Sequence, residues 1–177
     1  MMKVKQGDLD KLGLLFERYN RPLYSYFYRM SKEVPLSQDL VQSVFERMLK
    51  YRNTYSGTGA FTTWMFSIAR NAHIDHYRRI KRNGETGHLN EDQLEMAPPE
   101  YGEQDDLNSK KILLEKALDL LEEDKREVII LSRYEGLKYQ EIADIQETTE
   151  GAIKVKMFRA MKELKDVVLK LSEDCSK

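Results

Sequence analysis

The segment from Phe61 to Arg82 carries the residue types that could bind an opened nucleic acid. It begins with aromatic and apolar residues, passes through Asn71 and ends in a basic cluster of Arg78, Arg79, Lys81 and Arg82. Basic side chains hold phosphates, whereas flat aromatic faces and a side-chain amide can hold bases that have left the stack. The combination predicts a protein that grips nucleic acid in which some bases are unpaired.

A second candidate for DNA binding lies at residues 137–164, which have the pattern of a helix-turn-helix. Ile142, Ala143 and Ile145 would form the inner face of a short first helix, and Thr148 or Thr149 would cap the second. The second helix would then bury its inner side through Ile153, Met157 and Leu164. Its outer side would carry the groove-facing residues Lys154, Val155, Lys156, Phe158 and Arg159.

Both segments also have simpler interpretations. Aromatic residues at helical spacing are usually core, and Phe61, Met65 and Ile68 are expected there. A basic cluster is often a solvated face, and residues 137–164 could be a plain helical hairpin. Because both segments occur in one chain, with Asn71 between the aromatic and the basic residues, nucleic-acid binding is favoured.

His73, Asp75 and His76 raise the alternative of a metal enzyme. The two histidines could share one side of a helix, but no HExxH motif or cysteine set completes a ligand shell. No glycine-rich phosphate loop or nucleophile elbow is present either. We therefore expect no metal, no cofactor and no catalytic residues.

The composition is that of a soluble protein. Of 177 residues, 33% are charged and 41% hydrophobic, which is enough to build one medium or two small cores, and the net charge is −1. No apolar run approaches the roughly 20 residues of a membrane span. The N-terminal residues lack the apolar core of a signal peptide, and the single cysteine, Cys175, has no disulfide partner. We expect a cytoplasmic protein without membrane insertion.

The apolar periodicity predicts an all-α fold. Leu9, Leu12, Phe16, Tyr19 and Leu23 recur as one helix face would. A second helix is predicted to begin with Ser37 as its N-cap. Its apolar face would carry Leu40, Val44, Met48 and Tyr51. The turn-forming residues 55–59 precede a third helix that contains Phe61, Met65, Ile68 and Ala72.

Residues 83–107 differ from both flanks. They are rich in Asp, Glu, Gly and Pro and poor in apolar residues, so they predict a flexible acidic linker between two small helical domains, residues 1–82 and 108–177. Such a linker could be a solvated tether, or its acids could compete with DNA for basic faces.

Three motifs, in this order, resemble the extracytoplasmic-function (ECF) sigma factors of bacterial RNA polymerase. The first is DLVQSVF at residues 39–45. The second is FxTWxxxIAxNxxxDxxRR from Phe61 to Arg79, and the third is TxGAIKVKMxRA from Thr149 to Ala160. The resemblance covers nearly the whole chain. It implies a region 2 domain and a region 4 domain joined by the linker, with no long inhibitory segment before them and no third domain between them.

The resemblance also implies roles for individual residues. A loop and the helix after it would capture a flipped base of the −10 element and hold the DNA backbone around it. The residues implied in this role are Tyr55, Ser56, Gly57, Thr58, Gly59, Ala60, Trp64, Asn71, Arg78, Arg79 and Arg82. The −35 element would be met by Lys154, Val155, Lys156, Phe158 and Arg159. The clamp coiled coil of the polymerase core would be bound through Asp39, Gln42 and Glu46.

The expected function is that of an RNA polymerase sigma factor, which directs the core enzyme to promoters and helps to melt them. Its expected partners are the polymerase core, through clamp and flap, promoter DNA and an anti-sigma factor. The alternative from another class is a helix-turn-helix regulator that acts without core polymerase. A core pull-down distinguishes the two.

Overall fold

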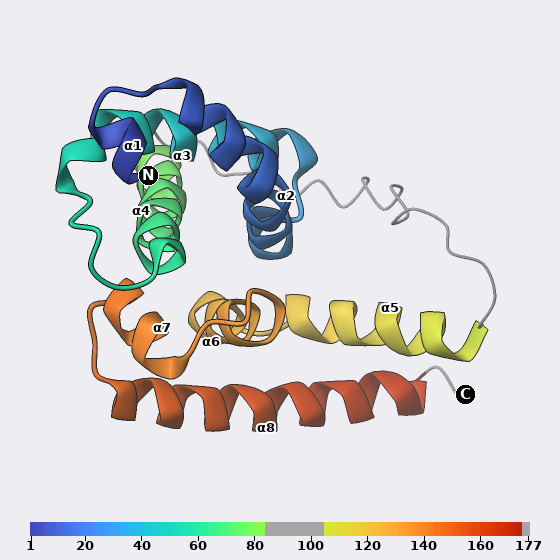
Figure 1. Cartoon of the computed structure of the whole chain (residues 1–177). Coiled ribbons are helices and arrows are strands. Elements are labelled where there is room, and N and C mark those ends of the chain that lie inside the picture. The colour runs from blue at the N-terminus through green and yellow to red at the C-terminus, as the bar shows by residue number, and fades with distance from the viewer. Residues whose placement is uncertain (84–104, 175–177) are drawn as a thin grey trace.

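The computed structural model describes residues 1–83 and 105–174, and within these ranges every regular element is a helix (Figure 1). The helices form an upper and a lower body in Figure 1, α1–α4 and α5–α8. The predicted all-α fold with two helical domains is therefore confirmed. Most of the predicted acidic linker, residues 83–107, lies outside the described residues, and α5 already begins at Asp105.

The N-terminal domain is built around α3, which packs against both α2 and α4. Its elements are α1 (Met2–Lys5), α2 (Asp10–Ser31), α3 (Val34–Lys50), the short 3₁₀ helix η1 (Arg52–Thr54) and α4 (Phe61–Asn83). As predicted, Leu40, Val44 and Met48 face the core, whereas Tyr51, predicted on the same face, follows the end of α3 and is 43% exposed. Met65 of α4 is also fully buried, whereas Phe61 and Ile68 pack at its edge.

The predicted apolar face of the first long helix is only partly correct. Leu9 and Phe16 are 51% and 47% exposed, and the buried side of α2 lies further along, at Leu23, Tyr26 and Phe27. Leu9 is the N-cap residue before α2, and in the first turns of the helix Leu12 and Leu15 pack only at the edge of the core, while the Phe16 ring contacts Phe45.

The predicted start of the next helix is wrong. α3 begins at Val34, and Ser37 is a fully buried interior residue rather than the N-cap. Pro35 occupies the first turn, where its fixed φ fits a helix and its missing N–H leaves no bond unmade. The Ser37 hydroxyl instead donates to the carbonyl oxygen of Glu33 at 2.6 Å, which is the i−4 bond of a serine inside a helix.

The C-terminal domain contains the predicted helix-turn-helix. Its elements are α5 (Asp105–Asp119), α6 (Glu123–Ile129), the π-helical segment η2 (Ile130–Tyr134), α7 (Tyr139–Ile145) and α8 (Glu150–Asp174). α7 and α8 are the two helices of the motif, and their predicted inner faces are buried. Thr149 caps α8, because its hydroxyl oxygen accepts a hydrogen bond from the Ala152 N–H at 3.1 Å.

The two domains contact each other in this structure. Figure 1 shows the beginning of α4 directly above α7, and α4 packs on α7 while α2 contacts α6 and η2. In the described ranges no helix combines the length and the apolar character needed to cross a membrane.

Replacing Ile142 with Ala should destabilise the C-terminal domain strongly. Ile142 is fully buried between α7 and α8, so the truncation leaves a cavity and should lower the free energy of unfolding by about 2–5 kcal/mol. Urea denaturation followed by circular dichroism measures this loss. Leu169→Ala, at a site 50% exposed on α8, is the control and should change stability by less than about 1 kcal/mol. Equal losses would show that the inner face is misassigned.

Candidate nucleic-acid interface

A cavity of about 270 Å³ lies beside the loop that precedes α4. The loop and the end of η1 contribute Thr54, Tyr55, Ser56, Thr58, Gly59 and Ala60, and α4 contributes Thr63, Trp64 and Ser67. The structure thus brings most of the predicted loop together with Trp64. Sequence reasoning missed Thr63 and Ser67, although both lie on the helix face that Trp64 adjoins.

Aromatic rings form one wall of this cavity. The ring centroid of Tyr55 lies 5.2 Å from that of Trp64 and 5.9 Å from that of Phe61. Trp64 also donates its indole N–H to the Thr54 hydroxyl at 3.4 Å. Because Tyr55 is only 8% exposed, it supports the wall, and the partly exposed Trp64 is the ring that a ligand can reach.

The loop conformation depends on two glycines and on α1. Gly57 and Gly59 have φ angles of +79° and +74°, which other residues rarely adopt. A side chain at Gly57 would also meet the Met2 sulfur at 3.0 Å. Lys5 of α1 donates to the Tyr55 carbonyl oxygen at 2.8 Å. The start of the chain therefore holds the loop against the domain.

Asn71 and the basic cluster continue from this cavity along α4. Asn71 does not line the cavity; it is exposed and lies one turn beyond Ser67 on the same side of the helix. In the last turns of α4 the basic residues Arg78, Arg79, Lys81 and Arg82 are exposed. A strand leaving the cavity along α4 would meet the amide first and the guanidinium groups afterwards.

The outer face of α8 is exposed as predicted, with one exception. Val155 and Phe158 are 50% and 73% exposed, and Lys154 and Arg159 are exposed beside them. Lys156 instead turns inward, where its Nζ lies 3.1 Å from Asp124 Oδ2 and 2.9 Å from Gln146 Oε1. A salt bridge with Glu150 at 2.7 Å holds Lys154 on the helix surface.

Asp39, Gln42 and Glu46 form a polar stripe on α3, opposite the buried face of that helix. All three are exposed, and the Gln42 amide donates to Glu46 Oε1 at 3.1 Å. The stripe therefore has the geometry of a surface that a partner can reach from solvent.

His73, Asp75 and His76 do not converge, so the metal-enzyme interpretation has no support in the described residues. His73 is buried with its Nδ1 3.2 Å from Glu123 Oε1, and Asp75 accepts a hydrogen bond from Arg47 at 2.8 Å. The His76 ring lies edge-on to Tyr77. Among the described residues there is no group of three His, Cys, Asp or Glu side chains that could hold a metal ion.

Comparison with known proteins identifies the family. The model of sigma-70 region 2 matches residues 15–83, and that of sigma-70 region 4 matches residues 111–164. The ECF RNA polymerase sigma factor SigX of Bacillus subtilis is 31% identical over 174 residues, covering 93% of this chain and 87% of SigX. The chain belongs to the ECF sigma factors. It is an RNA polymerase sigma factor with DNA-binding regions that act in transcription initiation.

Other relatives agree with this assignment. The sigma factor CarQ of Myxococcus xanthus is 28% identical over 169 residues, covering 95% of each chain. Two solved structures share the fold: RpoE of Bartonella quintana with the anti-sigma factor NepR and CnrH with the cytosolic domain of CnrY. RpoE has a TM-score of 0.73 at 23% identity, and the match covers 89% of this chain and 96% of RpoE. CnrH has a TM-score of 0.70 at 19% identity, and the match covers 94% of this chain and 93% of CnrH.

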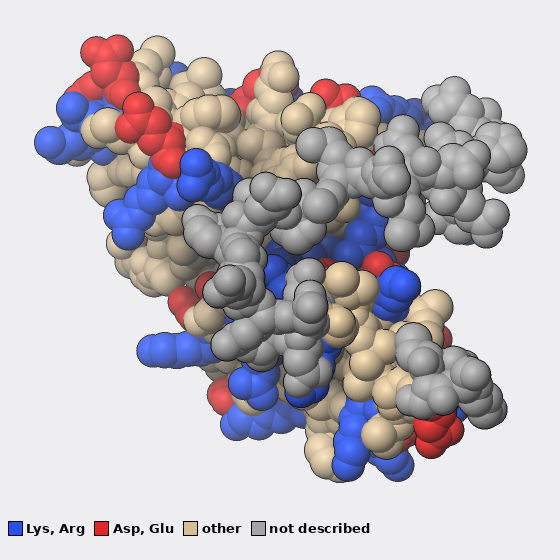
Figure 2. Space-filling model, turned by 90° about the vertical axis from the view of Figure 1, so that its right-hand side faces the viewer, with Lys and Arg blue, Asp and Glu red and all other residues tan. Residues whose placement is uncertain are grey.

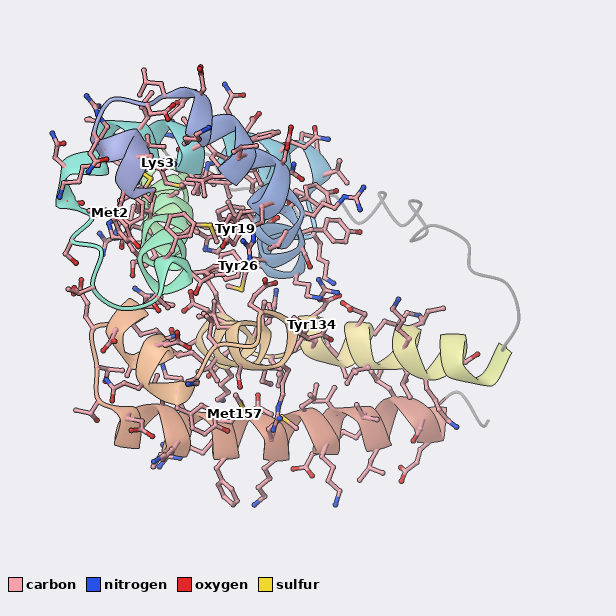
Figure 3. All side chains as sticks on the ribbon, viewed as in Figure 1. Met2, Lys3, Tyr19, Tyr26, Tyr134 and Met157 are labelled. Atoms are coloured by element: carbon pink, nitrogen blue, oxygen red, sulfur yellow. The ribbon has the colours of Figure 1, made fainter. Side chains whose placement is uncertain are left out.

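The sigma factor also has a buried carboxylate between its two domains, which sequence reasoning missed. Glu127 of α6 is 5% exposed and accepts hydrogen bonds from Tyr26 at 2.8 Å, Arg70 at 3.2 Å and Gln146 at 2.7 Å. Figure 3 shows Tyr26 on the underside of the N-terminal domain, facing α6. Burial, together with the charge of Glu127, raises the pKa of Tyr26 well above its usual value, so its hydroxyl stays a donor.

Ion pairs from the end of α2 to α5, and a guanidinium of α2 stacked on η2, extend this contact. Lys32 pairs with Glu115 and Asp119 at 3.3 and 2.9 Å, and Arg29 lies over the Tyr134 ring, 4.1 Å from its centroid. On the face in Figure 2, Lys and Arg side chains gather at the level where the domains meet. Polar and charged groups therefore form part of the contact between the two domains.

Glu135 should make the stability of the sigma factor depend on pH. Burial raises the pKa of this carboxyl group from 4.5 to about 7, although nearby Arg29 opposes the shift. The folded protein then holds a proton that the unfolded chain releases, so stability should fall as pH rises from about 4.5 to about 7. Urea denaturation of wild type and Glu135→Gln across this range measures the effect. The substitution should remove the part of the loss in stability that comes from Glu135. If the free energy of unfolding depends on pH in the same way in both proteins, the raised pKa of Glu135 is wrong.

Proposed function

We propose that this sigma factor captures a displaced base of the −10 element in the cavity between residues 54–60 and the start of α4. The observation that supports this most directly is the cavity itself, which combines the partly exposed Trp64 ring with the hydroxyls of Ser56, Thr58 and Thr63. An aromatic face stacks on a base, and hydroxyls can donate to or accept from its edge. Capture would offset the few kcal/mol needed to unstack the base.

The exposed side of α4 would hold the strand that leaves this cavity. Asn71 follows the cavity by one turn, and the basic residues from Arg78 to Arg82 follow in turn. The twelve residues of helix from Asn71 to Arg82 span about 16 Å, which is enough to follow several phosphates. These contacts would depend on salt because they neutralise phosphate charge.

The outer face of α8 would bind the −35 element in the major groove. Lys154 and Arg159 can bind phosphates or guanine edges, while Val155 and Phe158 offer apolar surface to thymine methyl groups. Lys156, although predicted to join them, would first have to leave Asp124 and Gln146. We therefore assign it a smaller share of the binding.

The polymerase core would bind both domains. The stripe of Asp39, Gln42 and Glu46 is proposed to contact the clamp coiled coil, and the C-terminal domain to contact the flap. An anti-sigma factor is a further proposed partner, because RpoE, which shares the fold, was solved in complex with the anti-sigma factor NepR. Core binding separates this function from that of a regulator that works without polymerase.

The two DNA contacts should be separable by mutation. Asn71→Ala should weaken binding to −10 single-stranded DNA while leaving −35 duplex binding unchanged, and Lys154→Ala should do the reverse, each by roughly 1–3 kcal/mol. Fluorescence anisotropy of the holoenzyme with fork-junction and −35 duplex probes, taken from a promoter mapped after overexpression, measures both. Lys165→Ala, on an exposed turn further along α8, is the control. Equal losses on both probes for either variant would refute the assignment.

Core binding should depend on the stripe on α3. Replacing Asp39, Gln42 and Glu46 together with Ala should weaken core binding by more than about 1 kcal/mol, because interface residues near a contact centre carry most of the energy. All three are exposed, so folding should be preserved. A titration of labelled sigma factor with core polymerase gives the affinity, with Asp166→Ala as the control. Unchanged affinity would show that the core binds elsewhere.

A further inference from the structure

We propose that α7 of the C-terminal domain plugs the −10 cavity, so that the sigma factor with its domains in contact cannot capture a base. This inference rests on the proposed function of the cavity. It concerns regulation by the chain itself, with no second protein, and it assigns a role to the interface between the domains.

The geometry places α7 at the open side of the cavity. Glu141 and Asp144 line the cavity together with the loop residues and with Thr63, Trp64 and Ser67 of α4. The Thr63 hydroxyl donates to Glu141 Oε1 at 3.4 Å. Figure 1 shows α7 beneath the loop and the first turn of α4. A base entering from this side would have to displace α7.

The charge of α7 adds to this steric block. Glu141 and Asp144 put two carboxylates at the entrance that a polyanionic strand must use, and like charges repel at short range. Gln140 donates to Asp144 Oδ1 at 2.9 Å, and Glu141 Oε2 accepts the Lys138 N–H at 2.8 Å. These bonds lie within α7 and its cap, so they fix the two carboxylates on α7 without help from the N-terminal domain.

α7 cannot move away from the cavity by itself. Its inner residues Ile142 and Ala143 are fully buried within the helix-turn-helix. Opening the cavity therefore requires the whole C-terminal domain to separate from α4. α7 and α8 are packed together in one helix-turn-helix, so the outer face of α8, which is proposed to bind the −35 element, moves together with α7.

The buried Glu127 cluster keeps the domains together. Tyr26 and Arg70 of the N-terminal domain both donate to this carboxylate, and Arg126 donates across the interface to the Met30 carbonyl oxygen at 3.0 Å. On separation water can replace these bonds, so their net contribution is much smaller than their number suggests. Such an interface can be opened by a partner, as polar contacts between domains usually can.

Closure lowers the DNA affinity of the free protein in a calculable way. If only a fraction of molecules is open, the apparent dissociation constant for −10 DNA is the intrinsic value divided by that fraction. A polymerase core that binds the two domains at separate places would favour the open form. Free sigma factor would then bind DNA poorly, and holoenzyme would bind it well.

Full-length variants of the interface test this proposal. Tyr26→Phe removes one hydrogen bond to Glu127 from the N-terminal side, and Glu127→Gln removes the charge from the C-terminal side. The matched control is Tyr24→Phe, on the same helix, where the ring stacks on Tyr28. Asp144→Ala removes a plug carboxylate without touching the Glu127 cluster.

Two measurements are made on each free protein. Hydrogen exchange of residues 55–60 and 139–145 reports whether the domains are apart. Fluorescence anisotropy reports binding of a labelled single-stranded oligonucleotide that carries the −10 element of a mapped promoter. We expect faster exchange in both segments for Tyr26→Phe and Glu127→Gln, and DNA binding tightened by about fivefold, the factor expected for one lost hydrogen bond. Asp144→Ala should tighten DNA binding with unchanged exchange, and Tyr24→Phe should change neither.

Two outcomes would overturn the proposal. One is faster exchange without tighter DNA binding, and the other is exchange in wild type as fast as in both interface variants. The same oligonucleotide is also added to wild-type holoenzyme. Failure to bind there would show that the proposed base capture is wrong, whereas the exchange result would still decide whether α7 covers the loop.

Discussion

The arrangement of the two domains depends on a carboxylate that neither domain could bury alone. Glu127 is 5% exposed and collects donors from both sides: Tyr26 and Arg70 from the N-terminal domain and Gln146 from its own. A buried charge is tolerated only when it is well paired, so Glu127 can be buried here only where donors from both domains reach it. This constraint sets which faces of the domains meet, and therefore which surfaces remain accessible to DNA.

Within each domain, single helices serve the core and the function together. α4 buries Met65 and Ala69 while presenting Trp64, Asn71 and its basic end on other sides. α8 buries Ile153, Met157 and Leu164 while exposing Phe158 and its neighbours. The helical period of 3.6 residues permits this division. As a result, the core packing that stabilises each domain also fixes the direction in which its DNA-binding side chains point.

The same period explains what could be predicted from the sequence. The helix-turn-helix faces were predicted correctly because each depends on spacing within one helix. The prediction for Ser37 failed because Pro35 changes where α3 begins, and that for Leu9 failed because Leu9 is the exposed N-cap residue before α2. The contact between Tyr26 and Glu127 joins residues 101 positions apart, and no local pattern encodes it. The only sequence sign of it was a glutamate directly before the apolar run Val128–Leu131.

The account centres on one cavity that holds either α7 or a displaced base, and a distance between domains tests this most directly. Spin labels at Lys50→Cys, on the end of α3, and Gln140→Cys, on α7, would be placed in a Cys175→Ser background, and both sites are exposed. Pulsed electron paramagnetic resonance would then be recorded on free protein and on holoenzyme bound to promoter DNA. The account predicts one short distance in the free protein and a longer one with polymerase and DNA. The same distance in both states would contradict it.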